Sequence, residues 1–415
     1  MLGNAIYNIG IRTYRAAVGL AAATGNAKAK LWIDGRRHWR ERMKQQLKGT
    51  GPLIWVHAAS LGEFEQGRPV LEAIRGQYPH CRILLTFYSP SGYEVRKNYQ
   101  GADYVYYLPL DTPLNARDFL DIVRPGLVIF IKYEFWYHFL TALSQRQIPV
   151  LLISGIFRSN QLFFKPYGGM FRKLLRQFDW IFVQNQDSLD LLRQLGIEKA
   201  SLAGDTRFDR VFALLQEPAV LPAIDSFIHG RKSVIAGSTW EADEQVLADW
   251  WKANAQPDHC LILAPHEIHE AHIKQVQSFF PGAIRYSTGG QGNVLIIDNI
   301  GLLSLLYRYA RVTFIGGGFG KDGIHNILEP ATYSKPVVFG PVFHKYPEAA
   351  ALLAAGGGAT IGNVSALTNV MESLLEDDAL CMQTGNAAGR FVADNKGATG
   401  KILTYIQEKR FFTKA

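Results

Sequence analysis

The sequence predicts an α/β protein that folds into two doubly wound parallel sheets in tandem. The chain has 415 residues, of which 48% are hydrophobic, and this is enough to bury two cores, since single domains usually have about 100–200 residues. Short apolar runs alternate with polar or helical stretches in two series, and a proline-punctuated stretch at residues 217–222 separates the series. This alternation is typical of strand–helix units with parallel strands.

Each apolar run corresponds to one expected buried strand. The expected strands of the first sheet span residues 53–57, 83–87, 104–108, 127–131, 150–154 and 180–183. Those of the second sheet span residues 233–236, 260–264, 294–297, 312–315 and 336–339. Ligands of such sheets bind outside the carboxyl ends of the strands, so the residues that directly follow each strand are the candidates for function.

The N-terminal segment is both apolar and basic. Residues 2–24 are rich in Ala, Ile, Leu, Tyr and Val but contain Arg12 and Arg15. The basic residues that follow are Lys28, Lys30, Arg36, Arg37, Arg40, Arg42 and Lys44. This pattern predicts an amphipathic helix at a membrane surface or a marginal membrane anchor, and an ordinary helix packed on the first domain is the alternative. The two arginines interrupt the apolar centre that a cleaved signal peptide needs, so secretion is not expected.

The net charge and the cysteines limit the classes of partner and site. The formal net charge of +8 indicates an anionic partner, whether nucleic acid, a membrane surface or a phosphorylated substrate. Cys81, Cys260 and Cys381 are odd in number and far apart. They therefore favour reduced thiols in a cytosolic compartment over a disulfide framework or a structural zinc site.

The first expected strand runs into the segment HAASLGE, residues 57–63. This segment puts small residues and the Glu63 carboxylate at the carboxyl end of the strand. A glutamate in a partly desolvated site is suited to remove a proton from a sugar hydroxyl, so Glu63 is the candidate general base. Ser60 and Glu63 also have the S-x-x-E spacing of a capping box at a helix start, and the motif favours neither role over the other.

Two further clusters carry charge at an expected strand end and at the crossing between the domains. In KYEFWY, residues 132–137, Glu134 is expected to orient a substrate hydroxyl or a catalytic cation; a solvated strand end, with Lys132 and Glu134 on one side, is the alternative. In GDTRFD, residues 204–209, Arg207 is expected to neutralise a leaving phosphate through a bidentate contact, and a lone surface arginine is the alternative.

A glycine-rich segment follows an expected strand in the second half of the chain. GGGFG, residues 316–320, leads through KDGIH to NILEP, residues 326–330, and its small residues allow the backbone to approach a ligand closely. Asn326 is expected to cap a helix whose free N–H groups face an anion such as a nucleotide phosphate. Glu329 is expected to accept hydrogen bonds from a ribose, with a capping box as the alternative.

Several familiar motifs are absent or misleading. The glycines do not match G-x-G-x-x-G in its usual context and no P-loop occurs, which argues against dinucleotide oxidoreductases and P-loop nucleotidases. In PHEIHEAH, residues 265–272, the histidines are spaced i, i+3 and i+6 instead of the i, i+4 of a zinc helix. A metal site is therefore not expected, and His266, directly after a strand, is a candidate donor-site residue.

Taken together, the segments HAASLGE, KYEFW, GDTRFD, GSTW, APHE and GGGFGKDGIHNILEPA resemble, in order and separation, the 3-deoxy-D-manno-octulosonate (Kdo) transferases of lipopolysaccharide synthesis. The resemblance spans nearly the full chain. It implies the GT-B fold, with two Rossmann-like domains facing a cleft and a membrane-associated helix at residues 1–24. It also implies an acceptor-binding domain at residues 25–215 and a CMP-sugar-binding domain at residues 216–415, whose last helix can pack back on the first domain.

The resemblance further implies a function. This is the inverting transfer of Kdo from CMP-Kdo to a lipid A precursor, an acylated and phosphorylated glucosamine disaccharide, without a metal or other cofactor. The enzyme would act at the cytoplasmic face of the inner membrane of a Gram-negative type cell, against its anionic surface, and not on nucleic acid. A GT-B transferase or epimerase that uses a UDP-sugar is the alternative. A basic nucleic-acid-binding protein is less favoured, because no zinc finger or RNA-binding aromatic motif occurs.

The same resemblance implies residue roles. Glu63 matches the general base, and Glu134 and Arg207 match positions that stabilise the transition state. The positions that match donor-binding segments are Gly237, Ser238, Thr239, Pro265, His266, Ile300, Gly301, Leu302, Asn326, Ile327, Leu328 and Glu329. This chain departs from the commoner pattern at Arg207, where many members have lysine, at Lys132, where many have an acid, and in APHE, which lacks the arginine of A-P-R-H.

Overall fold

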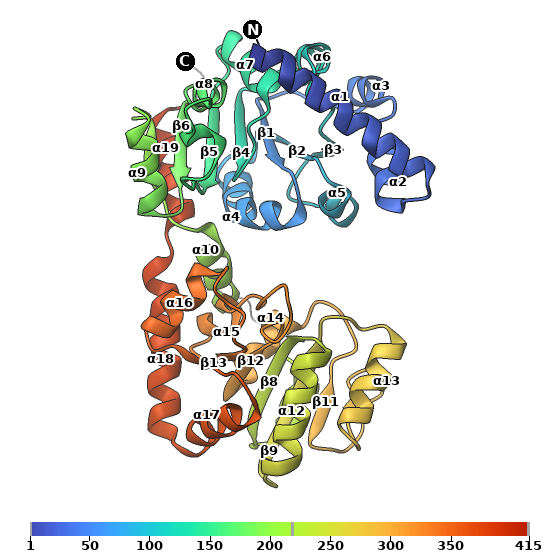
Figure 1. Cartoon of the computed structure of the whole chain (residues 1–415), viewed down its shortest axis with the longest axis vertical. Helices are drawn as coiled ribbons and strands as arrows, with labels where there is room; N and C mark the ends of the chain where they lie inside the picture. The colour runs from blue at the N-terminus through green and yellow to red at the C-terminus, as the bar shows by residue number, and fades with distance from the viewer. Residues whose placement is uncertain (1, 217–219, 413–415) are drawn as a thin grey trace. The chain divides into compact units, whose positions relative to one another are not determined.

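The computed structural model describes residues 2–216 and 220–412, so residues 217–219 of the proline-punctuated stretch lie outside the described residues. The chain divides into two compact units, the first made of Met1–Asp209 and Gly397–Ala415 and the second of Arg210–Lys396. The chain therefore passes from the first unit to the second near residue 210, a few residues before the boundary drawn from the sequence, and returns near residue 397 (Figure 1).

The first unit contains one parallel sheet in the order β3-β2-β1-β4-β5-β6-β7. Its strands are β1 (Leu53–Ala58), β2 (Arg82–Phe87), β3 (Tyr104–Tyr107), β4 (Leu127–Ile131), β5 (Val150–Gly155), β6 (Trp180–Val183) and β7 (Ala200–Leu202). The pairs Ile54↔Ile83 and Ile54↔Leu127 set the register of β1 with its two neighbours. Because the strand order reverses next to β1, the carboxyl ends of β1 and β4 form the switch point at which ligands of such sheets bind.

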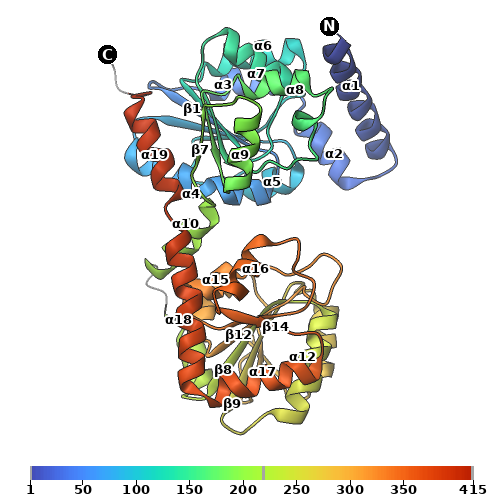
Figure 2. The same ribbon diagram turned by 60° about the vertical axis from the view of Figure 1, so that its left-hand side comes forward.

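Helices cover both faces of this sheet (Figures 1 and 2). They are α1 (Leu2–Ala23), α2 (Ala27–Asp34), α3 (Trp39–Gln46), α4 (Leu61–Gln77), α5 (Pro90–Arg96), α6 (Pro113–Val123), α7 (Tyr137–Gln145), α8 (Gly169–Leu175), α9 (Gln186–Gln194), the start of α10 (Thr206–Ala213), and α19 (Ala398–Glu408). Successive residues of β1 face opposite sides: Trp55 packs in one core with Phe119, whereas Ile54 packs in the other with Ile402.

The last helix, α19, belongs to the first unit although it follows the whole second unit in the sequence. It packs against α4, and Ile402 and Ile406 are fully buried in the core there. The Asp209 carboxylate holds the start of this helix, because it accepts hydrogen bonds from the backbone N–H groups of Gly397, at 2.6 Å, and Thr399, at 2.9 Å. Asp209 is the last residue of the GDTRFD segment. This segment therefore connects the point where the chain leaves the first unit to the point where it returns.

The N-terminal helix α1 packs on the first unit through polar contacts. The Tyr7 hydroxyl donates to the Asp111 carboxylate at 2.6 Å, and Asn8 Oδ1 lies 2.6 Å from His138 Nε2. Asp111 is fully buried and also accepts from two backbone N–H groups of α7, and burial raises its pKa to about 6. Ile6 and Ile9 of the same helix are exposed. Within the described ranges, no helix is long and apolar enough to cross a membrane.

The second unit contains another parallel sheet, in the order β10-β11-β9-β8-β12-β13-β14. Its strands are β8 (Lys232–Thr239), β9 (His259–Pro265), β10 (Ile284–Arg285), β11 (Val294–Ile296), β12 (Val312–Ile315), β13 (Val337–Phe339) and β14 (Gly358–Thr360). Its helices are α11 (Pro222–Ile228), α12 (Glu241–Asn254), α13 (Glu270–Phe279), α14 (Leu303–Leu306), α15 (Leu328–Thr332), α16 (Pro347–Ala354), α17 (Val364–Glu376) and α18 (Asp378–Asn395).

Every strand expected from the apolar runs is present in these two sheets. The prediction of two doubly wound parallel sheets is therefore confirmed. The strands β7, β10 and β14 were not predicted, because each is short and none is an apolar run: their sequences are ASL, IR and GAT. The equally short β11 and β13 are entirely apolar and buried.

Candidate active site

Glu63 lies in the first turn of α4, just after the carboxyl end of β1. Ser60 caps this helix: its Oγ accepts from the Glu63 N–H at 3.4 Å, and Glu63 Oε2 accepts from the Ser60 N–H at 3.1 Å. The capping box that the sequence allowed is therefore present. The carboxylate is partly buried, and desolvation raises its pKa, with a further contribution from the negative charge of Glu134. A carboxylate whose pKa is raised in this way is a better proton acceptor than an exposed one, so capping and base catalysis are compatible.

Glu134 lies in the turn between β4 and α7 and is almost fully enclosed, with 3% of its surface exposed. Its Oε2 lies 2.8 Å from His57 Nε2 and accepts a hydrogen bond from Trp136 Nε1. His57 is the penultimate residue of β1 and is completely buried. The sequence did not single out His57 or Trp136, because a histidine within an apolar strand and a tryptophan at a helix start are both common core residues.

Lys132 follows the last residue of β4 and has a left-handed backbone, with φ of 70°. Its N–H donates to the carbonyl of Ile153 on the neighbouring strand at 2.9 Å. Burial lowers the pKa of the ammonium group, as does the positive charge of Arg207, whereas the Glu63 and Asp205 carboxylates act in the opposite direction. Non-glycine residues in this conformation are strained and cluster at functional sites, so Lys132 joins the candidate site as a cation near Glu63.

Arg207 lies at the start of α10 and is held by Asp205 of its own segment. Its Nε and one terminal nitrogen lie 2.8 and 2.7 Å from Asp205 Oδ2, and its backbone N–H donates to Asp205 Oδ1 at 2.9 Å. This ion pair fixes the guanidinium and offsets part of its charge. The sequence did not anticipate the pairing, because it treated Arg207 as a single cation.

The first unit therefore brings several predicted residues to one edge of its sheet. Glu63, Glu134 and Arg207 follow the carboxyl ends of β1, β4 and β7, respectively. The electrostatic influences of Glu134 on Glu63, and of Glu63 and Arg207 on Lys132, show that these groups lie close enough to interact. A carboxylate of raised pKa near a cation such as Lys132 can accept a proton while an anion binds to the neighbouring positive charges.

In the second unit, the predicted residues Gly237, Ser238 and Thr239 form the end of β8. Ser238 is left-handed, with φ of 54°, and the Thr239 hydroxyl donates to the buried Glu244 carboxylate at 2.9 Å. A Cβ at Gly316 would lie 2.3 Å from the Ser238 carbonyl oxygen. This glycine is therefore required so that the end of β12 can pack directly on the Gly237–Thr239 backbone.

The glycine-rich segment after β12 is organised by Asp243, a buried residue of α12. Its carboxylate accepts from the N–H groups of Gly317, at 2.7 Å, Phe319, at 3.4 Å, and Trp240, at 3.0 Å. A Cβ at Gly318 would lie 2.6 Å from the backbone of Gly340. These glycines thus allow close backbone packing. Two N–H groups of the loop, those of Gly317 and Phe319, donate to the Asp243 carboxylate inside the protein.

The predicted helix cap at Asn326 is displaced by one residue. Helix α15 starts at Leu328 with Ile327 in the cap position, and the helix has only five residues. Asn326 Oδ1 still accepts from the Leu328 N–H at 3.1 Å, and its amide nitrogen donates to Glu329 Oε1 at 3.0 Å. The expected helix start was one residue early because a side-chain turn of Asn326 precedes the helix. Asn326 and Glu329, both predicted to contact the donor, are in direct contact with each other.

Three aromatic rings from the loops that follow β8, β9 and β12 stack on one another. The ring planes of Trp240 and His325 are nearly parallel, at 15°, and Trp240 Nε1 donates to His325 Nε2 at 2.9 Å. The predicted donor-site residue His266 stacks on both, with ring centroids 4.6 Å from Trp240 and 4.5 Å from His325. Burial and the neighbouring His266 lower the pKa of His325 to about 4. Pro265 is the last residue of β9 and precedes this stack.

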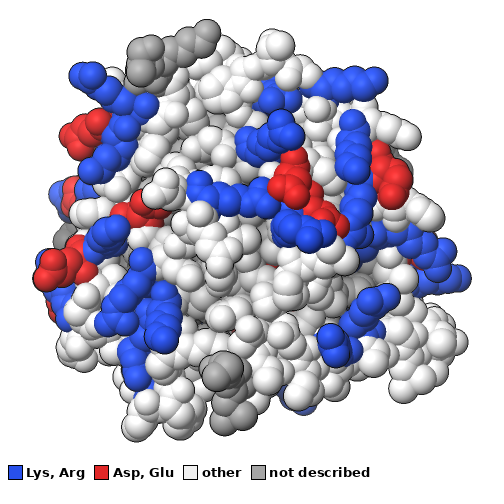
Figure 3. Space-filling view, turned by 90° about the horizontal axis from the view of Figure 1, so that it is seen from above, with Lys and Arg blue, Asp and Glu red and all other residues white. Residues whose placement is uncertain are grey.

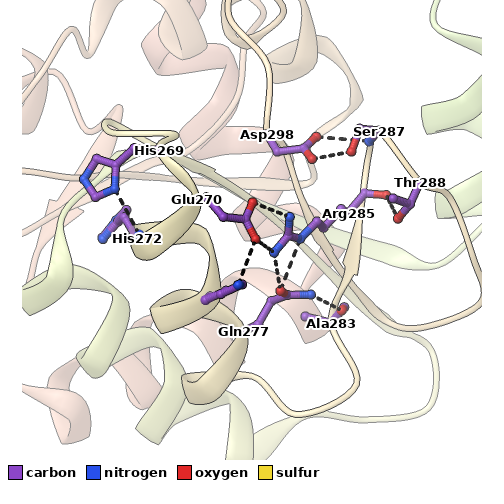
Figure 4. Close-up of polar contacts among 10 residues, drawn as sticks. His269, Glu270, His272, Gln277, Ala283, Arg285, Ser287, Thr288 and Asp298 are labelled. Carbon is purple, nitrogen blue, oxygen red and sulfur yellow. Dashed lines mark hydrogen bonds and ion pairs between the residues drawn. The ribbon is translucent and has the colours of Figure 1, made fainter.

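The remaining predicted donor segment, Ile300, Gly301 and Leu302, precedes α14. Ile300 is 88% exposed, Gly301 has φ of 102°, and Leu302 is the cap residue of α14. Asp298, two residues earlier, accepts from the backbone N–H of Ser287 at 3.0 Å and from its hydroxyl. Figure 4 shows that this contact ties the segment to the loop after β10.

The other histidines of PHEIHEAH have structural contacts. His269 caps α13 by accepting from the His272 N–H at 3.1 Å (Figure 4), and His272 Nε2 lies 3.2 Å from Glu244. Glu270, the first residue of α13, forms a two-point ion pair with Arg285, at 2.9 and 3.1 Å. In the part of the chain that the structure describes, no cluster of three or more His, Cys, Asp or Glu side chains could hold a metal ion.

Comparison with known proteins gives one consistent family. Residues 37–210 match the family model described as 3-Deoxy-D-manno-octulosonic-acid transferase (kdotransferase). The chain is 27% identical over 374 residues to the 3-deoxy-D-manno-octulosonic acid transferase of Haemophilus influenzae, covering 85% of this chain and 86% of that protein. It is 27% identical over 338 residues to the transferase of the same name from Aquifex aeolicus, covering 80% of this chain and 88% of that protein.

Solved structures with the same fold are more distant in sequence. The UDP-GlcNAc 2-epimerase of Neisseria meningitidis superposes with a TM-score of 0.62 at 17% identity, covering 86% of this chain and all of that chain. The MurG protein of Acinetobacter baumannii superposes with a TM-score of 0.55 at 13% identity, covering 86% and 100%. By its ordered motifs, the matched family model and the curated relatives, the chain is a glycosyltransferase similar to the 3-deoxy-D-manno-octulosonic-acid transferases. The solved structures show the fold alone, which has two Rossmann-like domains and resembles the GT-B fold.

Proposed function

We propose that this enzyme transfers Kdo from CMP-Kdo to a lipid A precursor in lipopolysaccharide biosynthesis, with inversion at the anomeric carbon and without a metal or other cofactor. Similarity to the 3-deoxy-D-manno-octulosonic-acid transferases supports the sugar that is transferred. The observation that carries the chemistry is the Glu63 carboxylate, which lies at the carboxyl edge of the first sheet with a raised pKa. A UDP-sugar as donor is the competing possibility, and competition between CMP and UDP for binding distinguishes the two.

The proposed step is a single displacement. The oxygen of an acceptor hydroxyl forms a bond to the anomeric carbon of Kdo while the bond from that carbon to the phosphate oxygen breaks. Glu63 takes the hydroxyl proton, and CMP leaves with the bonding electrons. Negative charge therefore develops on the leaving phosphate, and the Arg207 guanidinium, already oriented by Asp205, would stabilise it electrostatically. In the second unit, the segments around Gly237, His266 and Asn326 would hold the cytidine nucleotide.

Replacement of the base tests this proposal. Glu63→Gln retains a side chain that can complete the capping box with Ser60 but cannot accept the proton. We expect turnover of CMP-Kdo and the tetraacylated lipid A precursor to fall about 100- to 10,000-fold, with an unchanged melting temperature. Product mass identifies the donor, the acceptor and the number of sugars added. Near-normal turnover by this variant would contradict the role of Glu63.

We further propose that the enzyme lies on the cytoplasmic face of the inner membrane through α1. The exposed Ile6, Ile9 and Leu20 side chains support this role. So does a pocket of about 680 Å³ beside this helix, whose lining includes Arg15, Arg36, Arg37 and Arg40. Figure 3 shows a face of the molecule on which Lys and Arg side chains predominate over Asp and Glu. Apolar side chains beside basic ones are suited to an anionic lipid surface.

Vesicle binding tests the membrane role. The double substitution Ile6→Ser and Ile9→Ser removes exposed apolar surface from α1, and we expect binding to anionic phospholipid vesicles to weaken about 10-fold or more. Met382→Ser removes a similarly exposed apolar side chain of α18 and serves as the matched control. Equal binding by both variants and the unmodified protein would rule out α1 as the contact.

A further inference from the structure

A buried threonine of the GDTRFD segment joins the two helices that carry Glu63 and Arg207. Thr206, the residue before Arg207, has no exposed surface, and its hydroxyl donates to the carbonyl of Gln66 in the second turn of α4. Gln66 lies three residues after Glu63, which is about one turn of the same helix. The hydrogen bond therefore connects the start of α10 to the first turns of α4, although 140 positions separate its two residues in the sequence.

Ser154, at the end of β5, holds the same hydroxyl from another side. Its Oγ is buried and lies 3.1 Å from Thr206 Oγ1. Because the Gln66 carbonyl can only accept, the Thr206 hydrogen is used in that bond, and Ser154 is the donor in the second contact. The Thr206 hydroxyl thus donates to one element and accepts from another, and a side chain without a hydroxyl would lose both hydrogen bonds.

The backbone at Ser154 is irregular where it presents this hydroxyl. Its φ of 56° lies in the left-handed region, where a residue other than glycine is strained. Leu152 pairs with Ile181 and Gly155 pairs with Val183, so β5 has one extra residue between the two pairs. A bulge of this kind changes the direction of a side chain, and bulges are frequent next to active sites. The bulge accompanies the contact of Ser154 with α10.

Gln66 and its neighbour fix α4 against two strands of the sheet. Gln66 Oε1 accepts from Gln184 Nε2 at 3.0 Å, and Gln184 directly follows β6. A Cβ at Gly67 would lie 2.1 Å from Cδ1 of Ile131, the last residue of β4, so this glycine allows α4 to pack directly on that strand end. The start of α4 is therefore held at β4 and β6, and Thr206 connects α10 to the same place.

The rest of the GDTRFD segment holds Arg207 close to Thr206. The N–H groups of Ala203 and Gly204 donate to the Val183 carbonyl at 3.0 and 3.2 Å, and Asp205 pairs with the Arg207 guanidinium. Among the hydrogen bonds of this segment, that of Thr206 reaches the helix of Glu63. Loss of the hydroxyl would leave the pair of Asp205 and Arg207 intact but able to shift relative to α4.

We propose that Thr206 is a positioning residue for the transfer reaction: its hydroxyl, held between Gln66 and Ser154, sets the place of Arg207 relative to the helix that carries Glu63. The inference rests on the proposed roles of Glu63 and Arg207, and it assigns Thr206 no contact with substrate. A fixed charge stabilises a transition state only from the correct place. A small displacement of Arg207 should therefore slow the chemical step more than it weakens substrate binding.

Two substitutions of Thr206 separate the effect of its hydroxyl from that of its volume. Thr206→Val keeps the branched shape but removes the hydroxyl, and we expect kcat to fall about 10- to 100-fold with little change in KM for the lipid acceptor. Thr206→Ser keeps the hydroxyl and should retain most of the turnover. An unchanged kcat in Thr206→Val, or a Thr206→Ser enzyme as slow as the valine variant, would overturn the assignment.

A double-mutant cycle and a matched control test whether Thr206 acts through Arg207. Arg207→Gln removes the charge, so the addition of Thr206→Val should cause little further loss of kcat, whereas an equal loss in both backgrounds would overturn the proposal. The control is Thr313 of β12 in the second unit, which is fully buried and donates to the Pro336 carbonyl at 2.7 Å. Thr313→Val should leave kcat unchanged, and a fall as large as that in Thr206→Val would contradict a specific role of Thr206.

Nitrogen-15 NMR of the arginine side chains provides a test that needs no turnover. The Nε–H resonance of Arg207, assigned by its absence from Arg207→Gln, should move in Thr206→Val and stay in place in Thr206→Ser. Ser154→Ala removes the donor to the same hydroxyl, so it should also move this resonance, and it gives the answer should Thr206→Val not fold.

The same resonance separates failure of this inference from failure of the proposed function. An unmoved Arg207 resonance in folded Thr206→Val, or in Ser154→Ala should the valine variant not fold, would overturn the positioning role of Thr206, whatever the turnover. Normal turnover by Arg207→Gln would instead contradict the proposed role of Arg207 in the transfer reaction. The resonance would still report whether Thr206 positions that side chain.

Discussion

Two aspartates hold donors in segments for which the sequence predicts contact with a ligand. Asp205 fixes the Arg207 guanidinium, and Asp243 accepts from the amides of Gly317 and Phe319. Hydrogen bonds to an ionised acceptor are stronger than neutral ones. The segments that bear the predicted contacts are therefore already ordered in the absence of substrate. Less conformational entropy is then lost when a ligand binds.

The aromatic stack of the second unit gives a prediction for a single side chain. Trp240→Phe keeps an aromatic ring against His266 but removes the N–H that donates to His325 Nε2. A hydrogen bond to the neutral imidazole favours the neutral form, so we expect the pKa of His325 to rise from about 4. NMR titration of the His325 ring measures this, and an unchanged midpoint would show that burial and the neighbouring His266 keep the ring neutral without the hydrogen bond.

Among the secondary-structure elements, α1 is joined to the first unit by a hydrogen-bonded carboxylate. Asp111 bridges this helix and α7, because it accepts from the Tyr7 hydroxyl and from the first turn of α7. These contacts are polar and specific, whereas Ile6 and Ile9 on the same helix are exposed. The helix therefore packs on the domain, as in the alternative that the sequence allowed. Its exposed apolar side chains are the basis of the proposed membrane contact, which stays a prediction.

Asp111 should make the stability of the first unit depend on pH. Burial raises its pKa from 3.8 to about 6, so the folded protein binds this proton more tightly than the unfolded chain does. The contribution of Asp111 to the free energy of unfolding is therefore greatest below pH 4 and decreases as the pH rises to about 6, by up to about 3 kcal/mol. In Asp111→Asn the side chain has no ionisable group, so this contribution to the free energy of unfolding no longer changes with pH.

Urea unfolding at several pH values measures this effect. The stability of Asp111→Asn relative to the unmodified protein should increase between about pH 4 and pH 6, because only the unmodified protein loses the contribution. A stability difference that is constant over this range would contradict the raised pKa.

The long strands were predictable because each is a continuous buried apolar run, as in Leu127–Ile131 and Val312–Ile315. Such runs are typical of parallel sheets covered on both faces. The start of α15 was displaced, because the Asn326 side chain accepts from the second residue beyond it and so forms a turn before the helix. A sequence pattern cannot distinguish that turn from a true helix cap.

Part of the candidate site was also predictable. Glu63 and Glu134 directly follow strands, so their place at the sheet edge follows from topology alone. The partners His57 and Asp243 were not predicted, because their contacts with Glu134 and Gly317 join residues that are distant in sequence. Asp205 lies only two residues before Arg207, and the sequence carries no signal that its carboxylate pairs with that side chain. No local pattern encodes which donor a buried carboxylate will meet.

At the level of the whole molecule, the first unit depends on residues that come after the second. Ile402 and Ile406 of α19 are fully buried in the core beside β1. Removal of residues 397–415 should therefore destabilise the first unit by at least about 4 kcal/mol, since each lost buried isoleucine typically costs about 2–5 kcal/mol. Hydrogen exchange resolves this by unit: amides of β1 and β4 should exchange faster, and those of β8 and β9 should not. Equal acceleration in both sheets would contradict a unit-specific role.

The return of α19 also has a consequence for the order of events during synthesis. A ribosome makes the chain from its N-terminus, so both parallel sheets have emerged before the helix that completes the first core is available. The first unit cannot complete its core until α19 has been synthesised, so the surface that will receive Ile402 and Ile406 stays uncovered. The second unit can fold in the meantime. A chaperone that binds the nascent chain would therefore find its apolar target on the part of the protein that was made first.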